Sequence, residues 1–464
     1  MKTLLTVLLF TYSALNFAIP LPMQVLQSLK KANIPLESIA IEVQEVAHPS
    51  PMISLNATAA MNPASTMKLL TTYAGLELLG PAYTWKTEAY LDGHLNNGVL
   101  QGDLILKGYG DPKLTIEQFW LWMAEWRARG LREIRGDLVL DRSFFELPAH
   151  DSAAFDNDPV RAYNVGPDAL LLNFNTLRFR YLPEGERLNL MIEPPLAGIK
   201  LEYQLAPRAT GNCEDWDDTI SIQTTGEKIL LQGGYPATCG EREHNLSVLP
   251  HSRYVEGAFR TFWQQLGGSL TGKLRDGERP PTAQLYSTHH SETLSLAIRD
   301  INKYSNNVMA RQLFLTLGVM TTGGTASIPR STLVMRNWLI QKGLDFPELV
   351  LENGAGLSRI ERISAQHMAQ LLQSVTQSPF SAELIASLPI LGVDGSVKKR
   401  LNYSLAASHA HLKTGTLEGV KTLAGYVKAH SGKEWIVVFF INHPNAKHGQ
   451  AAQDALIEWL QTER

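Results

Sequence analysis

The chain is poor in cysteine and histidine and has no large excess of charge of either sign. Only 2 of its 464 residues are Cys and 13 are His, too few for a disulfide-rich scaffold or a zinc ribbon. Lys and Arg number 42 against 45 Asp and Glu, so the net charge of −3 gives no positive field for nucleic acid or an acidic membrane. With 44% hydrophobic residues, the composition is that of an ordinary globular protein of several domains.

Long apolar runs are also scarce. The longest internal candidate, Trp435–Ile441, is too short to span a bilayer and predicts a buried strand. At the N-terminus, a positive Met1-Lys2 precedes the apolar run Leu4–Phe10, which predicts a secretory signal peptide over residues 1–18 with cleavage after Ala18. The alternative is an uncleaved anchor helix. We expect an exported protein with at most peripheral membrane association.

Export would place both cysteines in an oxidising compartment. Cys213 and Cys239 are 26 positions apart, and we expect one disulfide that closes a local loop. The alternative is a pair of buried free thiols.

The two ends of the chain mix helical and strand patterns, and a β-rich block lies between them. Near the N-terminus, a strand is expected at Ile39–Val43, followed by a helix with Asn62 as N-cap and Pro63 at its first position. From about 83 to 281 the pattern changes to short alternating segments with many turns, interrupted by a helix at 116–129. After it, helices are expected at 292–317 (broken near 302–306), 331–342, 365–374 and 451–461, and a hairpin at 413–429 and 435–442. We interpret this pattern as one α/β domain split by a long β-rich insertion.

Three short motifs carry the chemistry, in this order along the chain: Ser65-x-x-Lys68, Ser305-x-Asn307 and Lys413-Thr414-Gly415. Together they match the motif set of serine enzymes that react with penicillin. Each is weak alone, because Ser-x-x-Lys also occurs twice elsewhere in the chain. The Ser65 motif differs from those two in lying in the first turn of a strongly apolar predicted helix.

That position suits a nucleophile and its base. A serine hydroxyl attacks only when a base takes its proton, and Lys68 lies one helical turn from Ser65. Lysine acts as a base only when neutral, which requires burial or a cationic neighbour to lower its pKa. For an isolated motif, the alternative is a capping serine beside a surface lysine.

The other two motifs supply groups that bind substrate or carry protons. Ser305 can relay a proton and the Asn307 amide can hold a substrate carbonyl. The alternative is a serine that only caps a helix.

In the third motif, Lys413 offers positive charge, Thr414 a hydroxyl for a terminal carboxylate, and Gly415 close backbone approach. The backbone N–H groups of Ser65 and Thr416 are candidate oxyanion donors. The alternative is an edge-strand lysine beside a turn glycine.

Other catalytic motifs are missing from the sequence. There is no H-E-x-x-H, G-x-S-x-G, P-loop or G-x-G-x-x-G pattern. His409-x-His411 lacks a third ligand, so we expect no metal and no cofactor.

With these motifs, the chain resembles the D-alanyl-D-alanine carboxypeptidase/endopeptidases of the class C low-molecular-mass penicillin-binding proteins (the penicillin-binding protein 4 type). The resemblance covers nearly all of the chain after residue 18 and includes the 240 positions that separate Ser65 from Ser305. Further matching segments are Leu106–Pro112, Ile134–Asp137 with Asp141, Pro167–Leu170, Gly354–Arg359, Leu388–Ile390 and Gly392–Gly395.

The resemblance implies a penicillin-binding domain with a five-stranded antiparallel sheet and helices on both sides, split by two β-rich domains. The corresponding division is 19–85 with 285–464 for the catalytic domain, 86–168 with 245–284 for domain II, and 169–244 for domain III nested within it. It also implies a periplasmic enzyme that cleaves peptidoglycan stem peptides and cross-links, with β-lactams as covalent inhibitors and a homodimer as a possible assembly. No nucleic-acid partner is expected.

By the same resemblance, Ser65 is the acylated nucleophile, Lys68 the base, and Lys413 with Thr414 the carboxylate-binding pair. The family often has Asp-Gly-Ser-Gly-Leu-Ser-Arg where this chain has Asn353–Arg359, and Asp-Gly-Thr at 394–396, where it has Asp-Gly-Ser. Glu418 stands where relatives carry a neutral glutamine.

The resemblance further suggests a pocket for the diaminopimelate side chain of the stem peptide. Arg359 would bind its carboxylate, Asp158 its ammonium, and Tyr163 would pack against its methylenes, with Glu418 nearby. The alternative is that Arg359 forms a structural salt bridge and Asp158 is an exposed loop residue.

Two other functions use the same residues differently. A β-lactamase would hydrolyse the acyl-enzyme rapidly, but the long insertion and the lack of an obvious deacylating base argue against it. A non-catalytic wall-binding protein could keep the fold, but the intact motifs argue against that.

Overall fold

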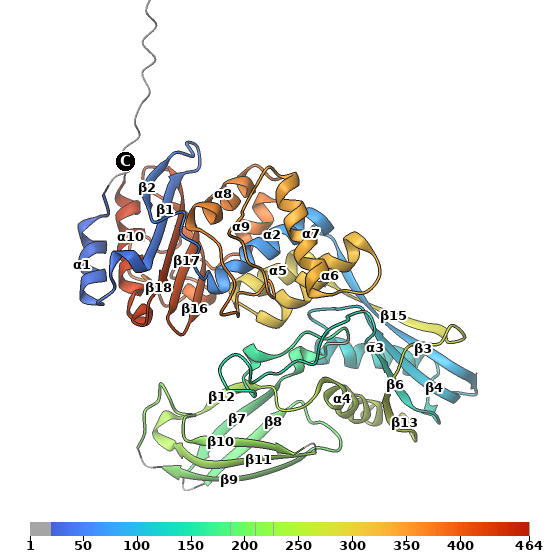
Figure 1. Ribbon diagram of the computed structural model, residues 1–464. Coiled ribbons are helices and arrows are strands. Elements are labelled where there is room, and N and C mark those ends of the chain that lie inside the picture. The colour runs from blue at the N-terminus through green and yellow to red at the C-terminus, as the bar shows by residue number, and fades with distance from the viewer. Residues whose placement is uncertain (1–19, 186, 209, 226, 464) are drawn as a thin grey trace, which may run out of the picture.

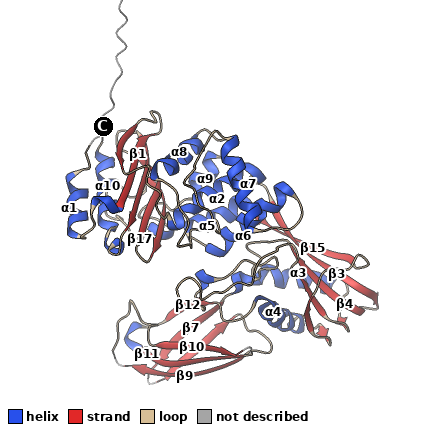
Figure 2. Cartoon of the chain, in the orientation of Figure 1, coloured by secondary structure: helices blue, strands red, loops and turns tan. Residues whose placement is uncertain are grey.

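The computed structural model describes residues 20–463 except 186, 209 and 226, so the predicted signal peptide lies outside the described residues. Figure 1 shows a body of sheet and helices that contains both ends of the described chain, with a second, strand-rich part below it. Helices gather in the body and most strands in the second part (Figure 2).

The body is built on a five-stranded sheet whose strands run in the order β16-β17-β18-β1-β2. Its strands are β1 (Ile39–Glu45), β2 (Pro51–Leu55), β16 (Ala410–Leu417), β17 (Val420–Lys428) and β18 (Glu434–Asn442). All neighbouring pairs are antiparallel, as the resemblance implied. The hairpin expectation was wrong in one respect: 413–429 is two strands, because the chain turns at Glu418-Gly419, where Gly419 has a left-handed φ of 72°.

Side chains alternate between the two faces of this sheet. Along β18, Ile436 and Val438 enter one apolar cluster while Val437 and Phe439 enter another, as the two-residue period of a strand requires. Two helices, α1 (Met23–Lys31) and α10 (Gln450–Thr462), pack on the second cluster. The first is covered by α2 (Lys68–Leu79), α5 (Leu294–Lys303), α6 (Asn307–Thr322), α7 (Ile328–Gln341), α8 (Ala365–Thr376) and α9 (Ser381–Ser387).

The chain between β3 and β15 forms the second part, which we call the inserted block (residues 84–293). Its seven-stranded sheet contains β3 (Thr84–Asn96), β4 (Val99–Gly108), β5 (Glu133–Ile134), β6 (Leu138–Asp141), β13 (Ser269–Leu270), β14 (Leu274–Asp276) and β15 (Gln284–Thr293). Two helices belong with it, α3 (Ile116–Ala128) and α4 (His251–Gln265). Because β15 pairs with β3, this sheet continues to residue 293, beyond the boundary of 284 expected from the sequence.

Two three-stranded sheets complete the inserted block. One contains β7 (Leu177–Glu184), β8 (Arg187–Glu193) and β12 (Arg242–Leu246); the other contains β9 (Lys200–Arg208), β10 (Ile220–Thr225) and β11 (Lys228–Pro236). The predicted Cys213–Cys239 disulfide is confirmed and lies in this region. The helix α4 was not predicted, although Tyr254, Ala258 and Phe262 recur at helical spacing and are buried.

Within residues 20–463 that the structure describes, no helix combines the length and apolarity needed to cross a membrane.

Candidate active site

Ser65 lies in a single 3₁₀ turn, Ala64–Met67, and the regular helix α2 starts only at Lys68. The expected helix start at Pro63 was therefore wrong. The Asn62 side chain accepts the Ala64 N–H at 2.8 Å, and Ala64 has a left-handed φ of 45°. The Pro63 carbonyl accepts the Thr422 hydroxyl of β17 at 2.7 Å, so contacts with the sheet, not an N-cap alone, hold the turn.

Three oxygen atoms surround the amine of Lys68. Nζ lies 3.0 Å from Ser65 Oγ, 2.6 Å from Asn307 Oδ1 and 2.5 Å from the Ala355 carbonyl oxygen. The amide and backbone carbonyl oxygens can only accept hydrogen bonds, whereas the Ser65 hydroxyl can also donate. A neutral amine with two N–H bonds and one lone pair satisfies all three contacts, with its lone pair on the Ser65 proton. This is the arrangement that a general base requires.

Both lysines of the site are fully buried. Burial, assisted by the nearby positive charges of Lys413 and Arg311, lowers the pKa of Lys68 well below its ordinary value, and Glu361 opposes the shift. Burial also lowers the pKa of Lys413 to about 7. Lys68 thus meets both conditions that favour a neutral lysine, burial and a cationic neighbour.

Ser305 occupies the break between α5 and α6 and has a left-handed φ of 57°, a strained conformation for a residue other than glycine. Asn306, not Ser305, caps α6 by accepting the Met309 N–H. Ser305 Oγ instead accepts the Lys413 ammonium at 2.9 Å. Asn307 binds Lys68 through Oδ1 and donates through Nδ2 to the carbonyl of Tyr163, at 3.1 Å, in the inserted block.

The third motif lies on β16, at the edge of the sheet. Gly415 must lack a side chain, because a Cβ there would lie 2.8 Å from the Ser65 nitrogen. The Thr414 hydroxyl lies 2.8 Å from the Ser396 hydroxyl. Of the site's hydroxyls, that of Ser305 is bound by Lys413, and those of Thr414 and Ser396 are hydrogen-bonded to each other.

The open edge of β16 also orients backbone donors. The Leu412 N–H donates outward to Pro389, and amide direction alternates along a strand, so the Thr416 N–H points to the same side. With Gly415 packed against the Ser65 nitrogen, this geometry is compatible with the expected oxyanion donors, Ser65 and Thr416.

The residues expected around the substrate side chain are brought together only in part. Arg359 lies 4.5 Å over the Phe155 ring and 3.6 Å from the exposed carboxylate of Glu418. Asp158 is instead bound to Arg161, at 2.7 Å.

The hydroxyl of Tyr163 donates to Asp156 at 2.8 Å. Asp156 was not singled out in the sequence. The sequence feature that could have identified Asp156 is its position two residues before Asp158, in the same loop.

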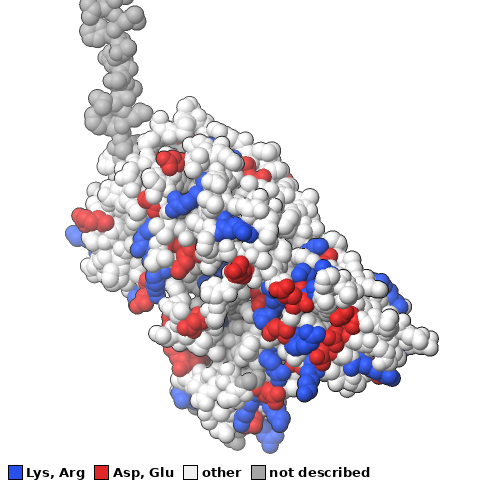
Figure 3. Space-filling view, turned by 45° about the vertical axis from the view of Figure 1, so that its right-hand side comes forward, with Lys and Arg blue, Asp and Glu red and all other residues white. Residues whose placement is uncertain are grey.

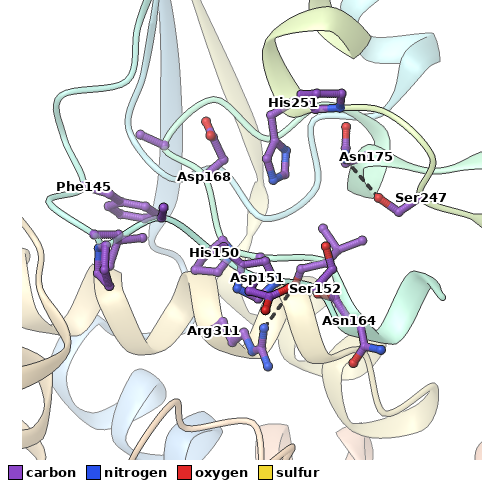
Figure 4. Close-up of a pocket in the computed structure, with 18 of the residues that line it drawn as sticks. Phe145, His150, Asp151, Ser152, Asn164, Asp168, Asn175, Ser247, His251 and Arg311 are labelled. Atoms are coloured by element: carbon purple, nitrogen blue, oxygen red, sulfur yellow. Dashed lines mark hydrogen bonds between the residues drawn. The ribbon is translucent and has the colours of Figure 1, made fainter. Parts of the chain in front are cut away.

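A cavity of about 1390 Å³ adjoins the site between α6 and the inserted block. Figure 4 shows His150, Asp151 and Arg311 converging on it from the two sides. It reaches the site through Asn353 and Arg359, although Ser65, Lys68 and Lys413 do not line it. Among the described residues, no group of three or more His, Cys, Asp or Glu is placed to hold a metal ion.

Comparison with known proteins places this geometry in a family. The model of the D-Ala-D-Ala carboxypeptidase 3 (S13) family matches residues 21–463. The chain is 27% identical over 399 residues to the D-alanyl-D-alanine carboxypeptidase DacB of Haemophilus influenzae, covering 83% of this chain and 81% of that protein. It is 28% identical over 389 residues to a D-alanyl-D-alanine carboxypeptidase of Actinomadura sp. R39, covering 80% and 71%.

Solved structures show the same fold. The crystal structure of penicillin-binding protein 4 (dacB) from H. influenzae superposes with a TM-score of 0.78 at 24% identity, covering 94% of this chain and all of that one. A predatory endopeptidase of Bdellovibrio bacteriovorus, Bd0816, gives a TM-score of 0.54 at 14% identity, with 92% and 93% covered. The resemblance noted in the sequence is confirmed, and the chain belongs to the D-Ala-D-Ala carboxypeptidase 3 (S13) family.

Proposed function

We propose that this protein is a serine-type D-Ala-D-Ala carboxypeptidase and DD-endopeptidase that cleaves peptidoglycan stem peptides and cross-links through an acyl-enzyme at Ser65. The observation that carries the proposal is the amine of Lys68. Two of its three neighbours, Asn307 and Ala355, can only accept its protons, and the third is the Ser65 hydroxyl.

In the first half-reaction, Lys68 takes the Ser65 proton as Oγ attacks the carbonyl carbon of the penultimate D-Ala. The N–H groups of Ser65 and Thr416 receive the developing oxyanion. Breakdown of the tetrahedral intermediate expels the terminal D-Ala, whose nitrogen takes the proton returned from Lys68 through Ser305. In the second half-reaction, Lys68 takes a proton from water as the water attacks the ester carbon. The bond from that carbon to Ser65 Oγ then breaks, the shortened peptide leaves as a carboxylic acid, and Lys68 returns the proton to Oγ.

The terminal carboxylate of the substrate binds beside Lys413, Thr414 and Ser396. The substrate carboxylate favours the protonated form of Lys413, which supplies the charge, and the two hydroxyls, 2.8 Å apart, supply hydrogen bonds. In a cross-link, the leaving amine belongs to the side chain of a second stem peptide, whose neighbouring carboxylate takes the same place. The open edge of β16 and the adjoining cavity leave room for this larger leaving group and for the remainder of the substrate strand.

The substrate side chain is proposed to be that of diaminopimelate. Arg359 would bind its carboxylate, and Tyr163 and Asp158, with Glu418 at the rim, would line the rest of the pocket. The Arg359→Ala variant should lose most activity on diaminopimelate-containing muropeptides, by about 2–5 kcal/mol of binding, yet still be acylated by a penicillin that lacks this side chain. If both rates fall together, Arg359 supports the fold and not the pocket.

The proposal also places the protein in the periplasm and predicts covalent inhibition by β-lactams. A solved structure of the H. influenzae penicillin-binding protein 4 is described as a complex with a β-lactam. Its similarity to this chain supports the same chemistry here, because Ser65, Lys68 and Lys413 are in contact with the partners that acylation needs.

The test is intact-mass spectrometry of wild type and Ser65→Ala after incubation with benzylpenicillin, followed by product analysis with defined muropeptides. We expect one penicilloyl adduct on wild type and none on the variant. Released D-Ala from monomers would establish the carboxypeptidase, and monomers released from dimers the endopeptidase. Rapid turnover of the adduct would favour a β-lactamase, and the absence of both adduct and products would favour a wall-binding protein.

A further inference from the structure

A buried carboxylate lies behind Lys68 and has no role in the reaction described above. Glu361 is fully buried, and its Oε1 accepts three successive backbone N–H groups, those of Glu352, Asn353 and Gly354, at 2.9–3.1 Å. Within the described part of the chain, its Oε2 has no hydrogen-bond partner. Burial of a carboxylate is costly unless hydrogen bonds compensate it, so a position of this kind calls for an explanation.

The three N–H groups lie at the start of a short loop, Glu352–Gly356, that contacts α2. Asn353 Oδ1 accepts the Ala355 N–H at 2.9 Å, and Gly354 and Gly356 take left-handed φ values of 68° and 79°. The Gly354 carbonyl accepts the Thr71 hydroxyl of α2 at 2.7 Å. The result is that the Ala355 carbonyl points at Lys68 Nζ.

The same loop also touches the backbone of the nucleophile. A Cβ on Gly356 would overlap the Ala64 carbonyl and lie 2.8 Å from the Ser65 nitrogen. A shift of this loop would therefore displace the base and the nucleophile together.

We infer that Glu361 is a positioning residue for Lys68. By holding the N–H groups of the loop, it places the Ala355 carbonyl so that it takes one N–H of the amine and leaves the lone pair on Ser65. The inference rests on the proposed function, since it assigns a task to Glu361 only if Lys68 is the base.

Asn353 is neutral, so the carboxylate that binds the backbone of this loop comes from Glu361. Four charged side chains bear on this cluster: Lys413 from β16, Arg311 from α6, Glu361 itself, and Glu352. Lys413 and Arg311 lower the pKa of Lys68 and Glu361 raises it, while burial raises the pKa of Glu361.

Two substitutions separate the hydrogen bonds of Glu361 from its charge. Glu361→Gln keeps an oxygen acceptor for the loop but removes the charge, and Glu361→Ala removes both. A matched control is Glu348→Ala, because Glu348 also accepts a backbone N–H, that of Ser364 at 2.8 Å, and contacts His367 but none of the site residues. The measurement is the rate of acylation by benzylpenicillin against pH, with thermal unfolding of each variant recorded separately.

For Glu361→Ala, the pH-independent acylation rate should fall about 10²-fold, the usual effect of misplacing a reacting group by about 1 Å. Glu361→Gln should retain most of that rate, but the acidic limb of its profile should move to lower pH, because the anion that favours protonated Lys68 is gone. Glu348→Ala should lower the unfolding temperature but change neither the acylation rate nor the position of the acidic limb of the pH profile.

The inference is overturned if folded Glu361→Ala is acylated at the wild-type rate. It is also overturned if the acidic limb of the pH–rate profile of Glu361→Gln coincides with that of wild type or of Glu348→Ala. Should Glu361→Ala fail to fold, the limb of Glu361→Gln decides alone. A wild type that forms no adduct at Ser65 overturns the proposed function along with the inference. A wild-type adduct with unaffected Glu361 variants overturns the inference alone.

Discussion

Asp141 in the inserted block and the lysines of the active site in the body are buried in opposite ways. In the inserted block, the fully buried Asp141 meets a cation, Lys107, at 2.6 Å and also accepts the Ser143 hydroxyl. In the body, Lys68 and Lys413 are both fully buried near each other, with the cation Arg311 a further neighbour. On the surface, charges of both signs are interspersed and are densest over the inserted block (Figure 3).

The difference distinguishes a structural ion pair from a site built for chemistry. Although burial raises it, hydrogen bonds from Lys107 and Ser143 hold the pKa of Asp141 below its ordinary value, so pairing stabilises the folded state. Burial of like charges does the reverse, because it favours neutral lysine and lowers stability. Such groups persist where function requires them. Four experiments test this contrast.

The largest effect on the reaction rate should come from Lys68. Lys68→Arg retains a cation but cannot accept a proton near neutral pH, so acylation by penicillin should fall by about 10²-fold or more. Rapid-quench mass spectrometry measures the rate. Acylation close to the wild-type rate would refute the role of Lys68 as base.

Among the effects on stability, the largest should come from the opposite-charge pair. Asp141→Asn leaves the Lys107 ammonium without its counter-ion, and the free energy of unfolding should fall by about 3–5 kcal/mol at pH 7. The pKa of Asp141 is lower in the folded protein than in the unfolded chain. Its ion pair therefore adds to the free energy of unfolding at pH values above the unfolded pKa, and this stabilisation is lost as the pH falls through the folded pKa. The deficit of the variant should therefore shrink in acid, measured by urea unfolding. If the variant loses the same free energy of unfolding at all pH values, the loss comes from altered packing and not from the ion pair.

The disulfide gives a somewhat smaller effect that is confined to the inserted block. Reduction of Cys213–Cys239, or its replacement by a double serine variant, should lower the free energy of unfolding by about 2–5 kcal/mol. Because the bridge belongs to the sheets of β7–β12, folded protein should acylate as before. A parallel loss of acylation would show that the two regions are coupled.

The smallest effect concerns the pH dependence of Lys413. Because the folded pKa of Lys413 is about 7 and that of the unfolded chain about 10.4, stability should rise with pH between these values. Lys413→Met removes this pH dependence. The free energy of unfolding of the variant minus that of wild type should therefore decrease by about 1 kcal/mol per pH unit from pH 7 to 9.5. Chemical denaturation at several pH values measures it. A constant difference would show that Lys413 stays charged throughout.

Predictions from local sequence succeeded where a short-range pattern determines the structure. The strand at Ile39–Val43, the helix at 116–129 and the end of α2 at Gly80 follow from alternation, helical periodicity and a left-handed C-cap. They failed where contacts distant in sequence decide. The start of α2 depends on Thr422 and Asn442 of the sheet, and so a 3₁₀ turn replaces the predicted helical start.

For the site, residue type and order along the chain were enough to identify the three motifs, the fold family and the cysteine pair. Folding was needed to place Asn307 and the Ala355 carbonyl on the two N–H bonds of Lys68, and Glu361 on the loop that carries this carbonyl. A backbone carbonyl has no residue signature, and a buried glutamate looks like any surface glutamate in a sequence. The protonation state of Lys68 follows from these neighbours and from burial, and both exist only once the chain has folded.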